Sequence, residues 1–467
     1  MMGIQIVILW SDLLIWLLVA AGIGVGLLIA RDPPLLSAWR RVGANRVGMA
    51  SATVLLAFIV IGLLDSLHYR VALEGKPGQK VQYAIEVLSL LDAVATPLRT
   101  RSEKTYSEPF ATRLYAKETI DVPGRGSVRD YPRLKHGGQH LGERENEVVA
   151  DASFTAFRAG VLAFLGWLAV AGGASVAVGR GDSTAASGWQ KIWRGETAFA
   201  WNAVLLTLGL MLLVAVPLFW LSGQYHVFGT DKVGQDVLYQ ILKSVRTGLI
   251  IGLVTTLVML PVAVLLGIVA GYFRGWVDDV IQYLYTVLNS IPGVLLIAAA
   301  VLMMQVVIDT HPQWFSTAAE RADLRLLALC FILGITSWTG LCRLLRGETL
   351  KLRELEYIQA AQAFGVSNWR IIVRHILPNL MHIVIIALVM DFSGLVLAEA
   401  VLSYVGIGVD PSMTSFGTMI NNARMELGRE PVVWWSLAAA FAAMFILVLA
   451  ANLFADAVRD AFDPRAA

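Results

Sequence analysis

Residues 247–271 read Thr247-GLIIGLVTTLVMLPVAVLLGIVA-Gly271 and contain no aspartate, glutamate, lysine or arginine. A helix rises about 1.5 Å per residue, and the hydrocarbon layer of a bilayer is about 30 Å thick. This stretch can therefore cross a membrane as one helix. The composition agrees, because 57% of the residues are hydrophobic and only 15% are charged, whereas about a quarter of the residues are charged in soluble domains.

Nine stretches of the chain have the length and apolar character of a membrane span. They lie near residues 4–30, 47–65, 158–179, 199–221, 247–271, 280–308, 325–345, 378–402 and 433–455. The first stretch lacks a basic start and is too long for the apolar region of a signal peptide, so we expect a retained helix. The sequence predicts an all-α polytopic membrane protein with about nine transmembrane helices.

The basic residues of the short connections fall on one side of the membrane if the nine spans alternate. These residues are Arg31, Arg40, Arg41, Arg46, Arg180, Lys191, Arg194, Arg274, Arg343, Arg346, Lys351, Arg353, Arg370, Arg374, Arg459 and Arg465. Cytoplasmic connections are enriched in lysine and arginine. We therefore expect an external N-terminus and a cytoplasmic C-terminus.

The remaining composition argues against several other classes of function. A net charge of +2 is too small to indicate a nucleic-acid partner. Cys330 and Cys342 would lie about 18 Å apart along one helix, which is beyond the reach of a disulfide. No metal-ligand cluster accompanies either cysteine, so we expect both to be packing residues.

Residues 66–157 form a polar segment with charges of both signs, which we expect to be an external insertion, because long translocated segments escape the charge rule. The apolar spacing in Val81–Ala95 predicts an amphipathic helix, and the glycines and prolines after it predict loops and short strands. His136 and His140 lie four residues apart, but without a third ligand they are more simply solvated loop residues. No catalytic group of residues stands out in this segment.

The connection between spans seven and eight reads Arg346-GETLKLRELEYIQAAQAFGVSNWRIIVRHIL-Pro378. Leucine, isoleucine and alanine side chains at helical spacing, with charges opposite, predict an amphipathic helix. Gly365 suits the left-handed residue that ends a helix, and Ser367 can cap the next one. Pro378 fits the first turn of span eight. We expect a helix, a glycine turn and a second helix at the cytoplasmic surface, where the pair could also simply rest against lipid headgroups.

Gln359-Ala-Ala-Gln-Ala-Phe-Gly365, followed by His375-Ile-Leu-Pro378, resembles the EAA loop of bacterial ATP-binding cassette (ABC) importer permeases. In that family the loop is a cytoplasmic helix that sits in a groove of an ATPase subunit. Gln359 stands where a glutamate is usual, although the nearby Glu356 could supply a carboxylate. The resemblance implies that ATPase coupling involves Glu356, Gln359, Ala360, Ala361, Gly365, His375 and Pro378.

Further stretches resemble the second, C-type subunit of the dipeptide and oligopeptide (peptide/nickel) branch. One is Phe228-GTDKVGQDV-Leu238, and the others, near the C-terminus, are Ala398-EAVLSYVGIG-Val409 and Asn452-LFADAVRDAFD-Pro464. Asp391 and Glu399 are carboxylates in or near span eight, where ionisable groups usually face a cavity or a partner. The residues expected to line the pathway or to dock a binding protein are Gly229, Asp231, Asp236, Asp391, Glu399, Gly406 and Gly408.

The resemblance covers residues 199–467 and implies a six-helix permease domain with its coupling loop at 346–378. The preceding chain would then be an extension of two helices (1–65), the external insertion (66–157), and a third helix with a cytoplasmic linker (158–198). The implied location is the bacterial inner membrane. The implied partners are a second permease subunit, two ATPase subunits, a periplasmic substrate-binding protein and membrane lipid, with no nucleic acid.

The sequence contains no G-x-x-x-x-G-K-[ST] phosphate loop, so we expect no ATPase activity and no cofactor in this chain, with ATP and Mg²⁺ acting in partner subunits. An ion-gradient-driven secondary transporter is the main alternative, although no internal repeat is apparent. A membrane-embedded enzyme is a third possibility, for which no nucleophile and base can be named. Peptides are the expected cargo, while nickel or sugars use similar permeases.

Overall fold

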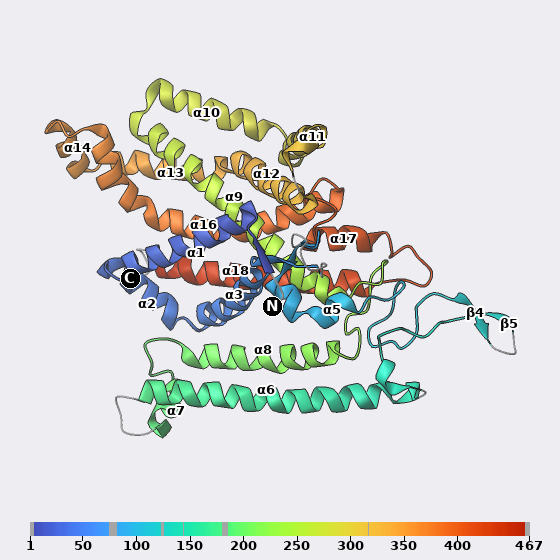
Figure 1. Cartoon of the computed structure of the whole chain (residues 1–467). Coiled ribbons are helices and arrows are strands. Elements are labelled where there is room, and N and C mark those ends of the chain that lie inside the picture. The colour runs from blue at the N-terminus through green and yellow to red at the C-terminus, as the bar shows by residue number, and fades with distance from the viewer. Residues whose placement is uncertain are drawn as a thin grey trace. The chain divides into compact units, whose positions relative to one another are not determined.

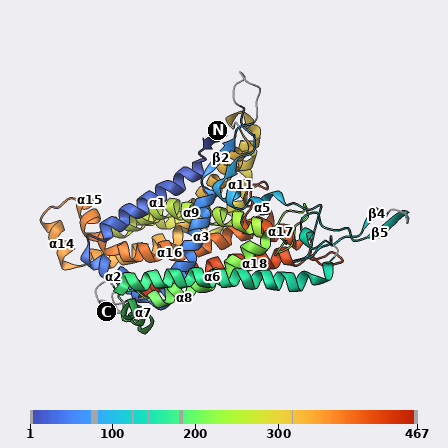
Figure 2. The same ribbon diagram turned by 60° about the horizontal axis from the view of Figure 1, so that its bottom comes forward.

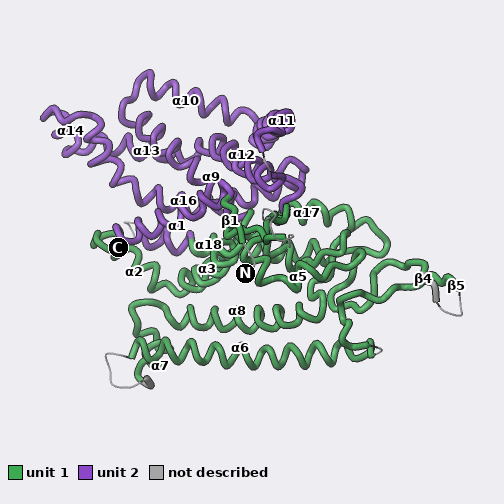
Figure 3. The backbone as a smooth tube through the Cα atoms, in the orientation of Figure 1, with its two compact units in different colours: residues 1–8, 29–247, 414–454 green, residues 9–28, 248–413, 455–467 purple. Residues whose placement is uncertain are grey.

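The computed structural model describes residues 4–73, 82–122, 126–142, 144–179, 185–315 and 317–462 (Figure 1). The chain forms two compact units (Figure 3). Unit 1 comprises residues 1–8, 29–247 and 414–454, and unit 2 comprises residues 9–28, 248–413 and 455–467. The chain passes between the units five times, and two of these crossings fall within the long helices α9 (Val237–Phe273) and α18 (Trp435–Phe462).

The all-α membrane architecture is confirmed. Within the described residues, eight helices are long and apolar enough to cross a membrane, or up to nine if a bent pair counts as one span. The bent pair is α12 (Ala318–Ser337) and α13 (Thr339–Arg353), which meet at 40°. The predicted sixth span is divided at Pro292 into α10 (Gly275–Ser290) and α11 (Gly293–Thr310), and only α11 meets the criteria for a span alone.

Unit 1 contains helices from the N-terminal region, from residues 66–157 (called the external segment after the prediction above) and from later parts of the chain. They are α2 (Pro33–Ala44), α3 (Arg46–Asp65), α4 (Leu90–Val94), α5 (Thr96–Thr100), α6 (Val148–Gly179), α7 (Ala185–Arg194), α8 (Trp201–Ser222) and α17 (Phe416–Arg424), with 3-10 turns at Gln139–Leu141 and Glu145–Glu147. Helices α6 and α8 run side by side in both views (Figures 1 and 2). The Trp167 indole N–H donates to the Leu205 carbonyl at 2.7 Å, and a side chain at Gly209 would collide with this indole.

Two small antiparallel sheets belong to unit 1. Strands β1 (Ile4–Val7), β2 (His68–Val71) and β3 (Leu88–Ser89) pair in that order, and β4 (Glu118–Val122) forms a hairpin with β5 (Gly126–Asp130). Of the helix predicted over Val81–Ala95, only Leu90–Val94 is helical in the described part, and the prediction is wrong at residues 88–89, which pair with β2 instead. Ser89 then forms a capping box with Asp92, so the helix that does form begins only at Leu90. Val81 lies outside the described residues.

Unit 2 contains α1 (Trp10–Ile29), most of α9, the helices α10 to α16, and a 3-10 turn at Pro312–Trp314. Its core is an apolar cluster drawn from α9, α13, α16 and the predicted coupling loop. The Arg346 guanidinium of α13 makes two hydrogen bonds of 2.6 Å to the Asp278 carboxylate of α10. Cys330 and Cys342 are free thiols with no exposed surface, as expected for packing residues.

Candidate functional site

The connection at 346–378 folds as two helices separated by a glycine, as predicted. Helix α14 (Glu356–Ala363) ends next to Gly365, whose φ of 71° lies in the left-handed region that glycine adopts without strain. Helix α15 (Asn368–Ile371) leads through a π-helical turn (Ile372–Ile376) into α16 (Leu377–Val405). Ser367 occupies the N-cap position of α15 but makes no capping hydrogen bond with its side chain. Pro378 lies in the first turn of α16, where its missing N–H costs little.

One face of this loop is fixed to the core of unit 2. Ile358, Ile371 and Ile376 have no exposed surface and belong to the apolar cluster that includes α9, α13 and α16. The Tyr272 hydroxyl, near the end of α9, donates to the Asn368 side chain at 2.9 Å and accepts from the Gln362 amide at 3.2 Å. A force applied to the loop would therefore reach α9 and α16 through buried contacts.

The opposite face of the loop is apolar and exposed. Phe364, which directly precedes the turn glycine, is 87% exposed. Four further large apolar side chains of the loop are 42–58% exposed: Leu355, Tyr357, Trp369 and Val373. An exposed apolar group next to charged residues is typical of a protein-interaction surface. Phe364 is not among the residues predicted for coupling, although it directly precedes the turn glycine in the sequence.

The polar residues predicted for coupling make local contacts. The Gln359 amide donates to the Glu354 carbonyl at 3.2 Å, so it stabilises the start of its own helix. Glu356 and Ala360 are exposed, and Ala361 packs against the apolar cluster. The His375 ring lies 6.2 Å from the Tyr357 ring. Gln359 and His375 are thus used within the loop, whereas Glu356 faces outward.

A second candidate site lies in the segment that precedes α9. Gly229 has a φ of 69°, and a Cβ atom there would collide with the Ser107 carbonyl oxygen. The Asp231 carboxylate accepts from the backbone N–H groups of Val233 and Gln235, as expected for an aspartate turn. Asp236 caps α9 by accepting from the N–H of Leu238 at 2.8 Å. The segment is therefore an aspartate turn followed by a capped helix.

This segment is held to the external segment by a buried charged cluster of Glu103, His226 and Asp236. The imidazole of His226 lies between the two carboxylates, 2.8 Å from Asp236 and 3.4 Å from Glu103, and all three side chains are at most 4% exposed. Burial opposes charge on the imidazole, but the hydrogen bonds to Asp236 and Glu103 outweigh it and raise the pKa of His226 to about 9. His226 is therefore protonated at neutral pH and donates to both carboxylates.

Glu103 also binds the backbone of the external segment. Its carboxylate accepts from the N–H groups of Lys135, His136 and Gly137 at 2.8, 2.7 and 3.1 Å. Burial alone would raise the pKa of Glu103, but His226 and these three donors lower it to about 2. One carboxylate thus connects residues 135–137 with the segment that leads into α9.

Lys243 in α9 connects the same region to the N-terminal helices. Its ammonium group lies 2.6 Å from the Asp65 carboxylate at the end of α3 and 3.2 Å from the Asp92 carboxylate in α4. The Tyr239 hydroxyl donates to Asp92 at 2.7 Å. These partners are far apart in the sequence, and sequence reasoning missed both this cluster and the one around His226.

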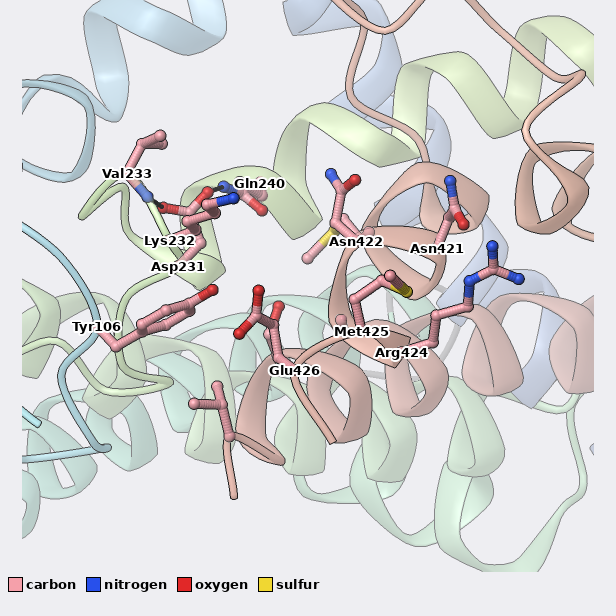
Figure 4. Close-up of a pocket in the computed structure, with 14 residues that line it drawn as sticks. Tyr106, Asp231, Lys232, Val233, Gln240, Asn421, Asn422, Arg424, Met425 and Glu426 are labelled. Carbon is pink, nitrogen blue, oxygen red and sulfur yellow. Dashed lines mark hydrogen bonds between the residues drawn. The ribbon is translucent and has the colours of Figure 1, made fainter. Parts of the chain in front are cut away.

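A polar pocket of about 480 Å³ opens between the external segment, the turn before α9 and α17 (Figure 4). The Tyr106 hydroxyl and the Glu426 carboxylate point toward each other across it, and Asp231 lines the same wall. Burial, followed by the nearby Glu426 carboxylate, raises the pKa of Tyr106. Burial also raises the pKa of Asp231, despite its hydrogen bonds. The pocket can accept polar or cationic groups.

The predicted pathway residues of span eight lie along α16. Glu399 is 2% exposed, and its carboxylate accepts from the Ser403 hydroxyl at 2.5 Å. Gly406 ends the helix with a φ of 87°, and a Cβ atom at Gly408 would collide with Ser403. Asp391 is partly buried and lines a separate pocket of unit 2. Helix α16 therefore ends in a tight turn at Gly406.

Residues 263–467, which include the coupling loop, match the family described as the binding-protein-dependent transport system inner membrane component. The glutathione transport system permease protein GsiD of Pectobacterium atrosepticum is 31% identical over 309 residues, covering 61% of this chain and 93% of GsiD. The chain therefore belongs to the family of binding-protein-dependent transport system inner membrane components. The oligopeptide transport system permease protein OppC of Mycobacterium tuberculosis is 31% identical over 242 residues, covering 52% of the chain and 77% of OppC. The dipeptide transport system permease protein DppC of Lactococcus lactis is 31% identical over 241 residues, covering 52% and 64%.

The chain is therefore a permease subunit of an ABC importer, as the resemblance implied, and a multi-pass membrane protein. Family membership supports this function over the ion-gradient-driven alternative. Permeases of this family work with ATPases, a further permease and a binding protein, so ATP hydrolysis belongs to other subunits.

Proposed function

We propose that this permease forms half of a translocation pathway for peptides and is driven by two ATPase subunits, one of which docks on residues 346–378. The observation that carries the coupling role is the two-faced loop. Its inner face is fixed to α9, α13 and α16, while Phe364 projects from its outer face. A groove in an ATPase that closed around this turn would move three spans together.

Peptide cargo is proposed from the relatives. Their names assign them glutathione, dipeptides and oligopeptides, which are all small peptides. A periplasmic binding protein would deliver the peptide, and ATP with Mg²⁺ would bind only in the partner subunits. We propose with it that the chain is oriented in the membrane with its N-terminus outside and its basic connections in the cytoplasm.

We assign residues 199–467 to the permease domain and residues 1–198 to an extension with an external insertion at 66–157. On this assignment Asp231 lines an outward-facing pocket where a binding protein can be oriented, while Gly229 and Asp236 shape the turn that holds it. Asp391, Glu399, Gly406 and Gly408 are assigned to the pathway and its outer end.

Phe364→Ser, with Phe364→Leu as its matched control, tests the coupling surface. Serine should reduce co-purification of the ATPase subunits and peptide uptake by reconstituted vesicles. It removes the aromatic side chain that the ATPase would bury in the proposed interface. Leucine keeps an apolar side chain and should retain most of both activities. Gly365→Pro should abolish coupling, because proline cannot adopt a φ of 71°.

Membrane insertion and co-purification of the second permease should remain unchanged in all three variants. Normal ATPase binding and normal transport by both Phe364→Ser and Gly365→Pro would show that this loop does not couple the subunits. Uptake of peptide by the purified chain alone, without any ATPase, would contradict the proposed function altogether.

A further inference from the structure

Asp391 places a carboxylate in the middle of a membrane span. It lies midway along α16 (Leu377–Val405), about 20 Å from either end at 1.5 Å per residue. Ionisable groups at such depth are costly unless they face a cavity or a partner. No hydrogen bond or ion pair of Asp391 is found within the described residues. The position therefore calls for a polar partner, and the described residues provide none to it directly.

A pocket of about 510 Å³ adjoins Asp391, within the size range of small-molecule sites. Its walls come from the start of α13, from α16 and from the end of α18. Most lining side chains are apolar, including Leu341, Leu344 and Ile386, and Ser337 lies beside the bend between α12 and α13. A Cβ atom at Gly340 would meet nothing within 4 Å, so the pocket is open there.

Arg459 of α18 lines the same pocket as Asp391. Within the described residues these two side chains form no ion pair with each other, and Arg459 has no other ion-pair partner. The pocket therefore presents a carboxylate and a guanidinium that remain available to a ligand, together with mostly apolar lining side chains. This arrangement favours a ligand carrying both charges over a single cationic side chain.

We infer that this pocket is a transient binding site for a zwitterionic solute with a free ammonium group and a free carboxylate. Asp391 binds the ammonium group, Arg459 binds the carboxylate, and the apolar wall of α13 and α16 contacts the side chains. A small peptide has these features, so the inference rests on the proposed peptide cargo and adds the residues that recognise it inside the membrane.

Cysteine labelling tests the site directly and does not depend on the binding protein. A Gly340→Cys variant of the full transporter, with Cys330 and Cys342 replaced by serine, is labelled with a maleimide in the presence of dialanine. Dialanine should slow labelling, whereas N-acetyl-dialanine and dialanine amide should protect roughly tenfold less, because each lacks one charge-assisted hydrogen bond. Asp391→Asn should abolish the preference for dialanine over N-acetyl-dialanine. Arg459→Gln should abolish the preference over the amide.

Asp460→Asn, an exposed change one residue beyond Arg459, is the matched control and should preserve both preferences. Equal protection by the three compounds, or by none, would overturn the inference. Loss of the second permease subunit from Asp391→Asn preparations would also overturn it, since Asp391 would then be an ion-pair partner between subunits. Peptide uptake by the unmodified transporter is measured in parallel. If uptake persists without protection, only this site is refuted, whereas absent uptake refutes the peptide cargo.

Discussion

Replacing Glu103 with glutamine should loosen the contact between the external segment and the residues that precede α9. The carboxylate accepts three backbone hydrogen bonds from residues 135–137 and faces the protonated His226 ring. Glutamine has nearly the same shape but only one acceptor oxygen, and its amide group would point at backbone donors. His226 would keep Asp236 as its only counter-ion.

The expected size of the effect follows from the pKa of Glu103. Its fall from 4.5 to about 2 corresponds to about 3 kcal/mol, at 1.36 kcal/mol per unit. The Glu103 side chain is 2% exposed, so screening by solvent reduces this free energy only slightly. The rise in the pKa of His226 from 6.5 to about 9 arises partly from the same contact, so it does not represent a separate contribution to the free energy.

Hydrogen exchange at residues 135–137 is the most direct measurement, because these amides are the donors. In Glu103→Gln their protection should fall by roughly a hundredfold, the equivalent of about 3 kcal/mol. Glu108→Gln, an exposed change in the same segment, should leave it unaltered. Unchanged protection in Glu103→Gln, or an equal loss in both variants, would refute the assigned role of Glu103.

The same cluster predicts a defined pH window. A lowered carboxylate pKa stabilises the fold above pH 4.5, and this contribution is lost as the pH falls toward 2. A raised imidazole pKa stabilises it below pH 6.5, and this contribution is lost as the pH rises through 9. Protection at residues 135–137, corrected for the intrinsic exchange rate, should therefore be greatest between pH 4.5 and 6.5. Equal protection at pH 6 and pH 10 would contradict the charged state of His226.

Two further substitutions probe neighbouring contacts of unit 1. Lys243→Met leaves two buried carboxylates without their cation and should destabilise the protein by about 3 kcal/mol, seen as a lower melting temperature in detergent, whereas Lys232→Met at an exposed position should not. Gly229→Ala combines a positive φ with a collision against a carbonyl oxygen and should cost about 2 kcal/mol or more. Gly142→Ala shares the positive φ but has open space, so equal losses in the two alanine variants would show that the collision is relieved.

Most of the spans found in the described residues and the two-helix form of residues 346–378 could be predicted, because each depends on local sequence. Span length follows from bilayer thickness, and the loop follows from Gly365 and the apolar spacing around it. The predicted helix over 81–95 failed because apolar spacing alone did not take account of strand pairing at residues 88–89 or of the Ser89 capping box. The Ser89 cap and the pairing with β2 therefore set the start of the helix at Leu90.

The charged clusters could not be predicted, because their members are distant in the sequence. Glu103 and His226 are separated by 123 residues, and Lys243 lies 178 residues from Asp65. Polar and charged side chains of this kind are ordinary in a hydrated segment, and nothing in their local spacing distinguishes a buried partner from a solvated one. Only the folded chain brings them together.

These clusters bear on whether residues 1–198 are a dispensable addition to the permease. Asp65 and Asp92 neutralise Lys243, and Glu103 neutralises His226. Both cations belong to the predicted permease domain, so removing the extension would take away both carboxylates of Lys243 and leave His226 with Asp236 alone. A truncated chain that begins at residue 199 should therefore fold poorly, while the same truncated chain carrying Lys243→Met and His226→Gln should recover part of its stability. Equal yields of these two truncated forms would show instead that the extension packs against a core that is stable without it.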